Sequence, residues 1–89
     1  MTESEMKALE LVLTERVKQE KKWGEQNHNP FIYLAILGEE YGELAKECVE
    51  HGLTGLDHDN NDRLLAEAVD TAAVALAFVA CLLRAKWRY

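Results

Sequence analysis

Apolar residues recur at helical spacing in three segments of this chain, and no segment shows the strict apolar–polar alternation of a strand. The first segment follows Thr2, whose hydroxyl forms a capping-box pattern with the Glu5 carboxylate, and Gly24 supplies its stop. Its apolar positions are Met6, Leu9, Leu13 and Val17. The pattern therefore predicts a first helix between Thr2 and Gly24.

The second segment opens at Asn29 and Pro30, because Asn favours the N-cap of a helix and Pro favours its first position. We expect this helix to run to about His51, with Gly52 as the residue that follows it. Its predicted dry face consists of Leu34, Leu37, Tyr41, Leu44 and Cys48. A third helix, capped by an Asn or Asp near position 61, is expected to continue almost to the end of the chain.

The third helix contains "AAVALAFVACLL", residues 72–83, which is apolar on all sides rather than along one stripe. Such a helix needs neighbours all around it, and two short helices cannot surround it. A second copy of the chain is the simplest cover. The sequence thus predicts one all-α domain over residues 1–89, with three main helices per chain forming a helical bundle completed by oligomerisation.

Composition narrows the function classes. The formal net charge of -6 argues against a protein that binds a nucleic-acid groove, since phosphate backbones require a positive surface. The longest apolar run is shorter than the roughly 20 residues that span a membrane, and the polar, acidic start is not a signal peptide. Cys48 and Cys81 are expected to be reduced, packed thiols. These features predict a cytoplasmic protein with no nucleic-acid and no membrane partner.

The stretch "GEEYGELAKECVE" places five glutamates within an arc of roughly 100° on the second helix; they are Glu39, Glu40, Glu43, Glu47 and Glu50. Each like-charge pair at i,i+3 or i,i+4 costs roughly 0.2–0.5 kcal/mol. A stable protein tolerates that sum without compensation. The stripe alone therefore fits a solvated face and a cation-binding face equally well.

Two acids on the third helix favour the interpretation of the stripe as a cation-binding face. Glu67 and Asp70 lie on a stripe that continues through Val74, Phe78 and Cys81, so we expect them to face a neighbouring helix. Unpaired buried carboxylates are costly, and a divalent ion neutralises them. Together with Glu40 and Glu43 they offer oxygen ligands from two helices, the type that Mg²⁺ or Mn²⁺ prefers.

The same residues resemble a known signature. Glu39, Glu40 and Glu43 in "GEEYGELA", followed by "EAVD" at 67–70, are similar to the E-E-x-x-E … E-x-x-D pattern of MazG-like nucleotide pyrophosphohydrolases, the all-α NTP pyrophosphatases. In the first helix "RVKQEKKWG" resembles the R-x-x-Q-x-x-K-W-G stretch of the short, single-domain members. The likeness covers about residues 15–78.

The resemblance implies a reaction and a set of roles. The family hydrolyses a nucleoside triphosphate to the monophosphate and pyrophosphate with Mg²⁺, often to clean the nucleotide pool, and its members are homodimers or homotetramers. By position, the metal ligands would be Glu40, Glu43, Glu67 and Asp70, and Glu39 would orient or deprotonate the attacking water. Trp23 would stack on the base, with Gln19 on the same side of the helix and Lys22 near phosphate. From the residues alone, Trp23 is also suited to anchor the helix end in the core, and Lys22 to a solvated face.

Two other functions stay open. A helical interaction protein could dock a basic partner on the acidic stripe, although this does not explain acids on the core stripe of the third helix. Within the resemblance, a narrower activity such as hydrolysis of dUTP or phosphoribosyl-ATP is the alternative to a general deoxynucleoside triphosphate pyrophosphatase.

Overall fold

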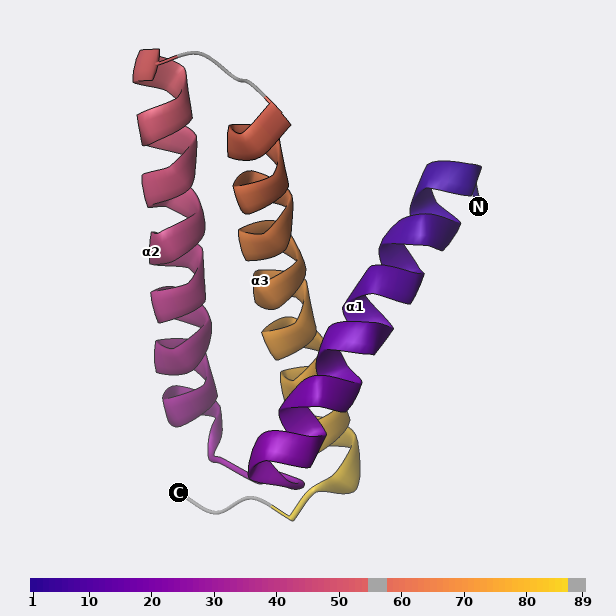
Figure 1. Cartoon of the computed structure of the whole chain (residues 1–89). Coiled ribbons are helices and arrows are strands. Elements are labelled where there is room, and N and C mark those ends of the chain that lie inside the picture. The colour runs from indigo at the N-terminus through magenta and orange to yellow at the C-terminus, as the bar shows by residue number, and fades with distance from the viewer. Residues whose placement is uncertain (55–57, 87–89) are drawn as a thin grey trace.

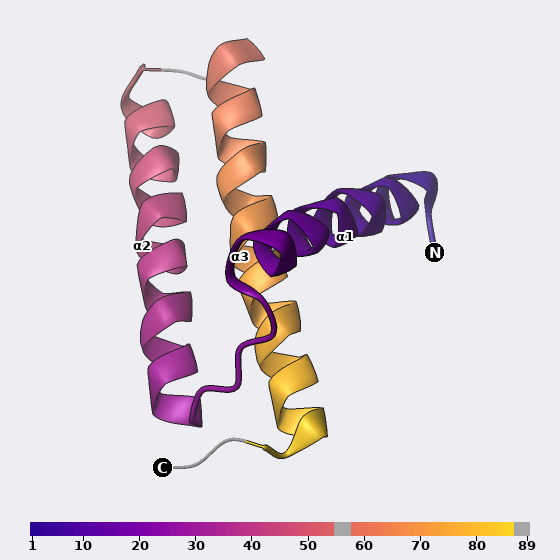
Figure 2. The same cartoon turned by 60° about the horizontal axis from the view of Figure 1, so that its bottom comes forward.

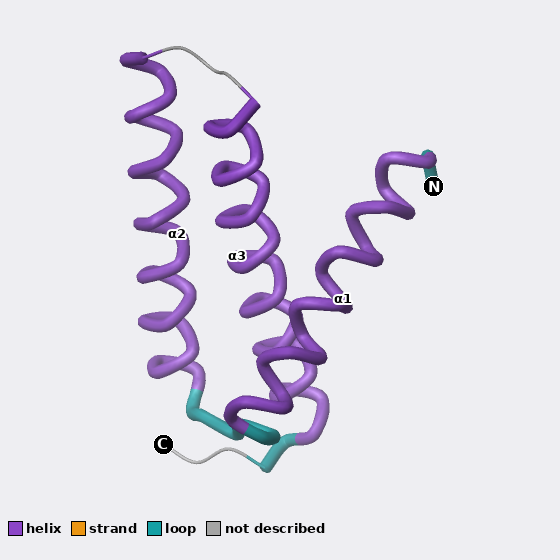
Figure 3. Tube along the Cα trace, viewed as in Figure 1, coloured by secondary structure: helices purple, strands orange, loops and turns teal. Residues whose placement is uncertain are grey.

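The computed structural model describes residues 1–54 and 58–86, and all the regular structure within them is helical (Figure 1, Figure 3). The helices are α1 (Glu3–Trp23), α2 (Pro30–Thr54) and α3 (His58–Arg84). The all-α fold class is thereby confirmed for the described part of the chain.

Local capping chemistry sets three of the helix ends where the sequence predicts them. At the start of α1, Glu5 N donates to Thr2 Oγ1 at 3.1 Å and Thr2 N donates to Glu5 Oε1 at 2.8 Å. Gly24 ends α1 with a φ of 73°, a left-handed value that glycine adopts without steric cost. Asn29 Oδ1 accepts the Ile32 N–H at 3.0 Å and so caps α2.

Both helices on either side of residues 55–57 are longer than predicted. α2 continues through Gly52 to Thr54, and α3 already begins at His58. Gly52 as the residue after the helix and a cap near position 61 are therefore wrong; the cap of α3 lies outside the described residues. A glycine inside a helix costs only about 1 kcal/mol relative to alanine, so it does not force a helix to stop.

The helix α3 is the centre of the chain. α2 lies antiparallel beside α3. The C-terminal half of α1 crosses α3 near the middle of α3, and the N-terminal end of α1 points away from both helices (Figure 1, Figure 2). Among the described residues, α1 contacts α3 but not α2. One chain therefore forms an open arrangement rather than a closed three-helix bundle.

The buried core lies between the start of α2 and the end of α3. Tyr33 stacks on Phe78 with ring centroids 5.0 Å apart, and Cys81 is fully buried with its Sγ 3.5 Å from the His28 carbonyl oxygen. Val74 is buried on the same stripe. The predicted inward stripe of the third helix and the packed thiol of Cys81 are thus confirmed.

The predicted apolar faces of the other two helices are open to solvent in the single chain. On α1 the exposed side chains are Met6, Leu9, Leu13 and Val17. On α2, Leu34 and Tyr41 are 61% and 66% exposed and Cys48 is exposed, whereas Leu37 and Leu44 are half-buried. Within one chain the prediction of a dry face on α2, and of a packed Cys48, is wrong, because α3 packs against the neighbouring face, which carries Tyr33 and Glu40.

The helix α3 also meets the length and composition of a membrane span over Asn61–Arg84. A mostly buried core helix of a water-soluble protein meets the same criteria, whereas 22% of the most apolar stretch of this helix is buried in the single chain. The segment also carries Glu67 and Asp70. The cytoplasmic location stays a prediction.

Candidate metal centre and adjoining cavity

Three carboxylates from two helices converge near the middle of the α2–α3 pair. Glu40 comes from α2 and Glu67 and Asp70 come from α3, and one oxygen of each lies within 4.8 Å of the others. Thr71 connects the two helices at this level, since its Oγ1 donates to the Glu67 carbonyl oxygen at 2.8 Å and lies 3.4 Å from that of Glu40. Among the described residues, no other group of acids, histidines or cysteines is arranged in this way.

Burial and mutual repulsion make the ionised form of this group unfavourable. Burial raises the pKa of Glu40, and the charges of Glu43 and Asp70 raise it further. The pKa of Glu67 is raised by burial and then by Glu43, and that of Asp70 by burial and then by Glu15. Glu67 Oε2 is buried and has no hydrogen-bond partner among the described residues. Such a group favours either extra protons or a cation, and its all-oxygen ligands suit Mg²⁺.

The other two acids of the predicted site lie at its edge. Glu43 is exposed along α2, yet its carboxylate is near enough to Glu67 to raise the pKa of that residue. Glu39 is exposed, and its charge is the weakest of those that raise the pKa of Glu40. The structure thus brings Glu40, Glu67 and Asp70 together, places Glu43 beside them, and leaves Glu39 outside the group.

One acid beside the cluster, Glu15, was missed by the sequence interpretation. Glu15 on α1 reaches Asp70 and raises its pKa, an effect partly offset by Lys18. The sequence feature that could have indicated Glu15 is the four-residue spacing of Leu11, Glu15 and Gln19, which puts these three residues on one side of the helix. That side is half-buried in the structure, whereas the more apolar stripe of α1 is not.

Glu47 and His51 form a largely buried pair on α2 next to the three carboxylates, and the Glu47 charge also raises the pKa of Glu67. His51, to which the sequence assigned no role, is 3% exposed, and its Nε2 lies 3.1 Å from Glu47 Oε2 in a geometry that makes no hydrogen bond. Arg63 Nε lies 3.9 Å from the same oxygen. Glu47, a member of the acidic stripe, therefore faces α3 and not bulk water.

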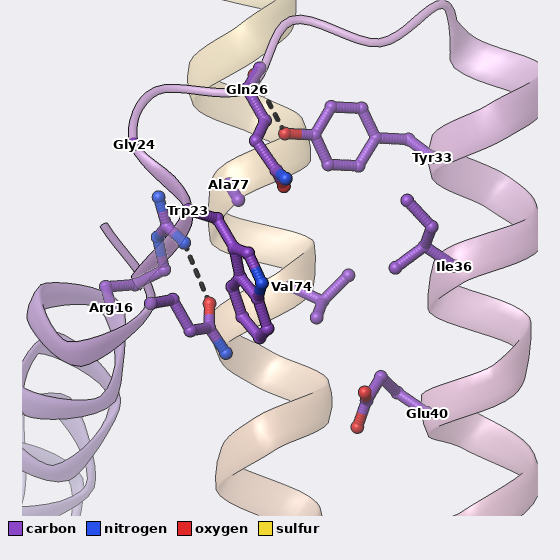
Figure 4. A pocket seen from close by; sticks show the side chains of 10 residues that line it. Arg16, Trp23, Gly24, Gln26, Tyr33, Ile36, Glu40, Val74 and Ala77 are labelled. Carbon is purple, nitrogen blue, oxygen red and sulfur yellow. Dashed lines mark hydrogen bonds between the residues drawn. The ribbon is translucent and has the colours of Figure 1, made fainter. Parts of the chain in front are cut away.

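A cavity of about 220 Å³ adjoins the acids (Figure 4). It lies between the end of α1, the start of α2 and the middle of α3, and its lining includes Gln19, Trp23, Tyr33, Val74 and, at one end, Glu40. Sites for drug-sized ligands occupy roughly 300–1,000 Å³. The cavity is therefore sized for a flat ring system, with room for a larger ligand only where it opens to solvent.

The three predicted substrate residues divide into two groups. Gln19 and Trp23 line the cavity, and the Trp23 side chain points into it in Figure 4. Trp23 is 56% exposed, so it is not a core anchor of the helix end. Lys22 is not a lining residue; its Nζ lies 4.7 Å from the centre of the Trp23 ring, a cation–π contact.

No family model, no curated protein and no solved structure matches the chain.

Proposed function

We propose that this chain is a Mg²⁺-dependent nucleoside triphosphate pyrophosphohydrolase that converts a (deoxy)nucleoside triphosphate and water to the monophosphate and pyrophosphate. One observation carries the proposal. The three converging carboxylates lie at one end of a cavity with an aromatic wall, and Glu40 belongs to both. A nucleotide is held by its phosphates and by its ring. The carboxylates would bind the cation that accompanies the phosphates, and the aromatic wall would bind the nucleobase.

The carboxylates do the anchoring. Glu40, Glu67 and Asp70 would hold Mg²⁺, with Glu43 within reach as a fourth ligand. A wall of carboxylates repels a polyphosphate, and bound Mg²⁺ would supply the positive charge that attracts it and offsets charge developing in the transition state. The orphaned Glu67 Oε2 fits this role, because a ligand oxygen needs no hydrogen-bond donor once a cation faces it.

The remaining residues position the reaction. Trp23 offers its ring to the nucleobase. The motif resemblance alone assigns the proton of the attacking water to Glu39, which is exposed and lies outside the carboxylate group in the single chain. In the reaction the water oxygen forms a bond to the α-phosphorus, and the bond from that phosphorus to the bridging oxygen breaks. The electron pair leaves with pyrophosphate. Attack at the α-phosphorus is what the MazG-like motif adds, since carboxylates alone allow attack at the γ-phosphorus too.

The alternative of a docking face for a basic partner receives less support. Such a face needs its glutamates turned outward, whereas Glu40 and Glu47 are half-buried between α2 and α3. The inward acids favour a small cation over a large basic surface.

A homo-oligomer, a dimer or a tetramer, belongs to the same proposal. Large apolar side chains are exposed on all three helices, among them Leu13 on α1, Leu34 on α2 and Val79 on α3. Extended exposed apolar surface of this kind marks protein interfaces in soluble proteins. A second copy of the chain has matching apolar faces to cover it.

Hydrolysis in oxygen-18-labelled water tests the reaction. Purified protein, Mg²⁺ and each deoxynucleoside triphosphate should yield the monophosphate and pyrophosphate, with the label in the monophosphate. Label found only in orthophosphate would refute attack at the α-phosphorus. Asp70→Asn should lower kcat by at least a hundredfold, about 2.7 kcal/mol, whereas Asp62→Asn, an exposed acid on the same helix, should leave it within twofold. Equal rates for the two variants would remove Asp70 from the site.

A further inference from the structure

The orientation of the Gln19 side-chain amide is fixed by its neighbour Arg16. Arg16 Nη1 donates to Gln19 Oε1 at 2.8 Å, the dashed line that runs from Arg16 in Figure 4. The guanidinium is held from its other side as well, since Nη2 lies 3.5 Å from Glu20 Oε1. Arginine has donors and no acceptor, so the amide must turn its oxygen toward Arg16.

This orientation decides what the cavity offers to a ligand. With its oxygen engaged, Gln19 has its NH₂ group left for the cavity that it lines. Arg16 lines the same wall and adds only N–H groups. The wall contributed by α1 therefore presents mainly donors from these two residues, since Arg16 already occupies one lone pair of the Gln19 oxygen. On the opposite wall, the Tyr33 hydroxyl donates its hydrogen to the Gln26 carbonyl oxygen at 3.1 Å, so toward a ligand it acts as an acceptor. Donors for recognition of a base therefore come from the α1 wall.

A donor wall discriminates between bases by their exocyclic groups. Uracil, thymine, guanine and hypoxanthine carry a carbonyl oxygen where cytosine and adenine carry an amine. A carbonyl oxygen of the base accepts a hydrogen bond from the Gln19 NH₂ group. An amine of the base is also a donor, so it and the Gln19 NH₂ group face each other without forming a hydrogen bond. An unpaired polar group in a partly closed site costs binding free energy.

We propose that the Arg16–Gln19 pair makes this site selective for nucleotides with a keto base over those with an amino base. Gln19 is the specificity-determining residue, and Arg16 is a positioning residue that acts through it. The inference rests on the proposed function for the identity of the ligand as a nucleotide. It adds the class of base, which neither the acidic motif nor the cation group specifies.

Two matched pairs of ligands test the inference without relying on turnover. The α,β-imido analogues of dUTP and dCTP, and of dITP and dATP, are titrated with Mg²⁺ by calorimetry. In each pair the keto analogue should bind roughly 10- to 100-fold more tightly, the effect of leaving one polar group unpaired with the amino analogue. Equal affinity within both pairs overturns this inference and leaves the proposed function standing. No binding of any analogue overturns the proposed function as well.

Variants separate the two roles. Gln19→Glu keeps an oxygen on Arg16 and replaces the NH₂ group by a second oxygen, so the preference should invert toward dCTP and dATP analogues. Arg16→Met frees the amide to rotate, and the keto preference should fall to within about threefold; Arg16→Lys, which keeps a donor, should retain most of it. Lys21→Met removes an exposed cation from the same helix and is the control, with the preference unchanged. An unaltered preference in Gln19→Glu, in protein shown by circular dichroism to be folded, overturns the assignment.

Discussion

Neutralising Glu67 should stabilise the metal-free protein, because it removes repulsion within the carboxylate group. One oxygen from each of Glu40, Glu67 and Asp70 lies within 4.8 Å of the others. Two unit charges at that distance repel by about 0.9 kcal/mol in water and about 3.5 kcal/mol at an effective dielectric constant of about 20. Glu67→Gln removes two such interactions. The three side chains are half-exposed, and screening by solvent and salt brings the net gain to about 1–2 kcal/mol.

The assay is thermal unfolding in chelator at pH 8 and fixed protein concentration. For a domain of this size each 1 kcal/mol shifts Tm by about 4–8 °C, so Glu67→Gln should raise Tm by roughly 4–16 °C. Asp62→Asn is the matched control on the same helix, and its Tm should change by less than an equivalent of about 0.5 kcal/mol. A variant with unchanged or lowered Tm, or an equal rise in the control, would refute the reasoning.

The pH dependence of this gain has a definite sign. Burial and like charges raise the pKa of Glu67 in the folded state, so between the ordinary carboxyl pKa near 4 and the raised value the native protein binds more protons than the unfolded chain. In that window stability falls as pH rises. The advantage of Glu67→Gln over the wild type should therefore be greatest at pH 8 and shrink as pH is lowered through the raised pKa.

Addition of Mg²⁺ should reverse the order of the melting temperatures, so that the wild type becomes more stable than Glu67→Gln. A ligand of the native state stabilises it by about 2.7 kcal/mol at a concentration of 100 Kd, and loss of one carboxylate removes much of that affinity. Mg²⁺ should thus raise the Tm of the wild type well above its own metal-free value and leave Glu67→Gln nearly unchanged. The effect on the wild type should weaken at low pH, because the ligands must be deprotonated. Equal Mg²⁺ shifts in both proteins would show that Glu67 binds no cation.

Two further predictions concern the fold and its assembly. Light scattering should give a mass at least twice that of the 10.1 kDa chain, and Leu34→Glu, which places a charge on the exposed apolar face of α2, should lower it; a stable monomeric wild type would contradict the proposed oligomer. Tyr33→Phe should lower the free energy of unfolding by about 0.5–1.5 kcal/mol in urea titrations, since it deletes the hydrogen bond to the Gln26 carbonyl while keeping the ring on Phe78. A loss above 3 kcal/mol would show that the hydroxyl does more than close that loop.

Local chemistry let the sequence determine three of the helix ends and the direction in which the acids of α3 face. Each of these ends depends on residues within four positions, so the local sequence is enough to predict it; they are the caps at Thr2 and Asn29 and the stop at Gly24. The inward direction of Glu67 and Asp70 was predictable too, because they share a stripe with buried Val74 and Cys81. This inward direction, together with the glutamates of the second helix, led to the prediction of the carboxylate group.

Tertiary structure alone decided which surfaces meet. A helical pattern shows that a face is apolar but not whether the same chain or another covers it, so the exposure of Met6 and Tyr41 could not be predicted. The approach of Glu15 to Asp70 and the turn of the Gln19 amide toward Arg16 depend on how α1 crosses α3 and on side-chain geometry. Contacts between helices are fixed by packing over the whole chain, and the physical information for them is not contained in any single stretch of sequence.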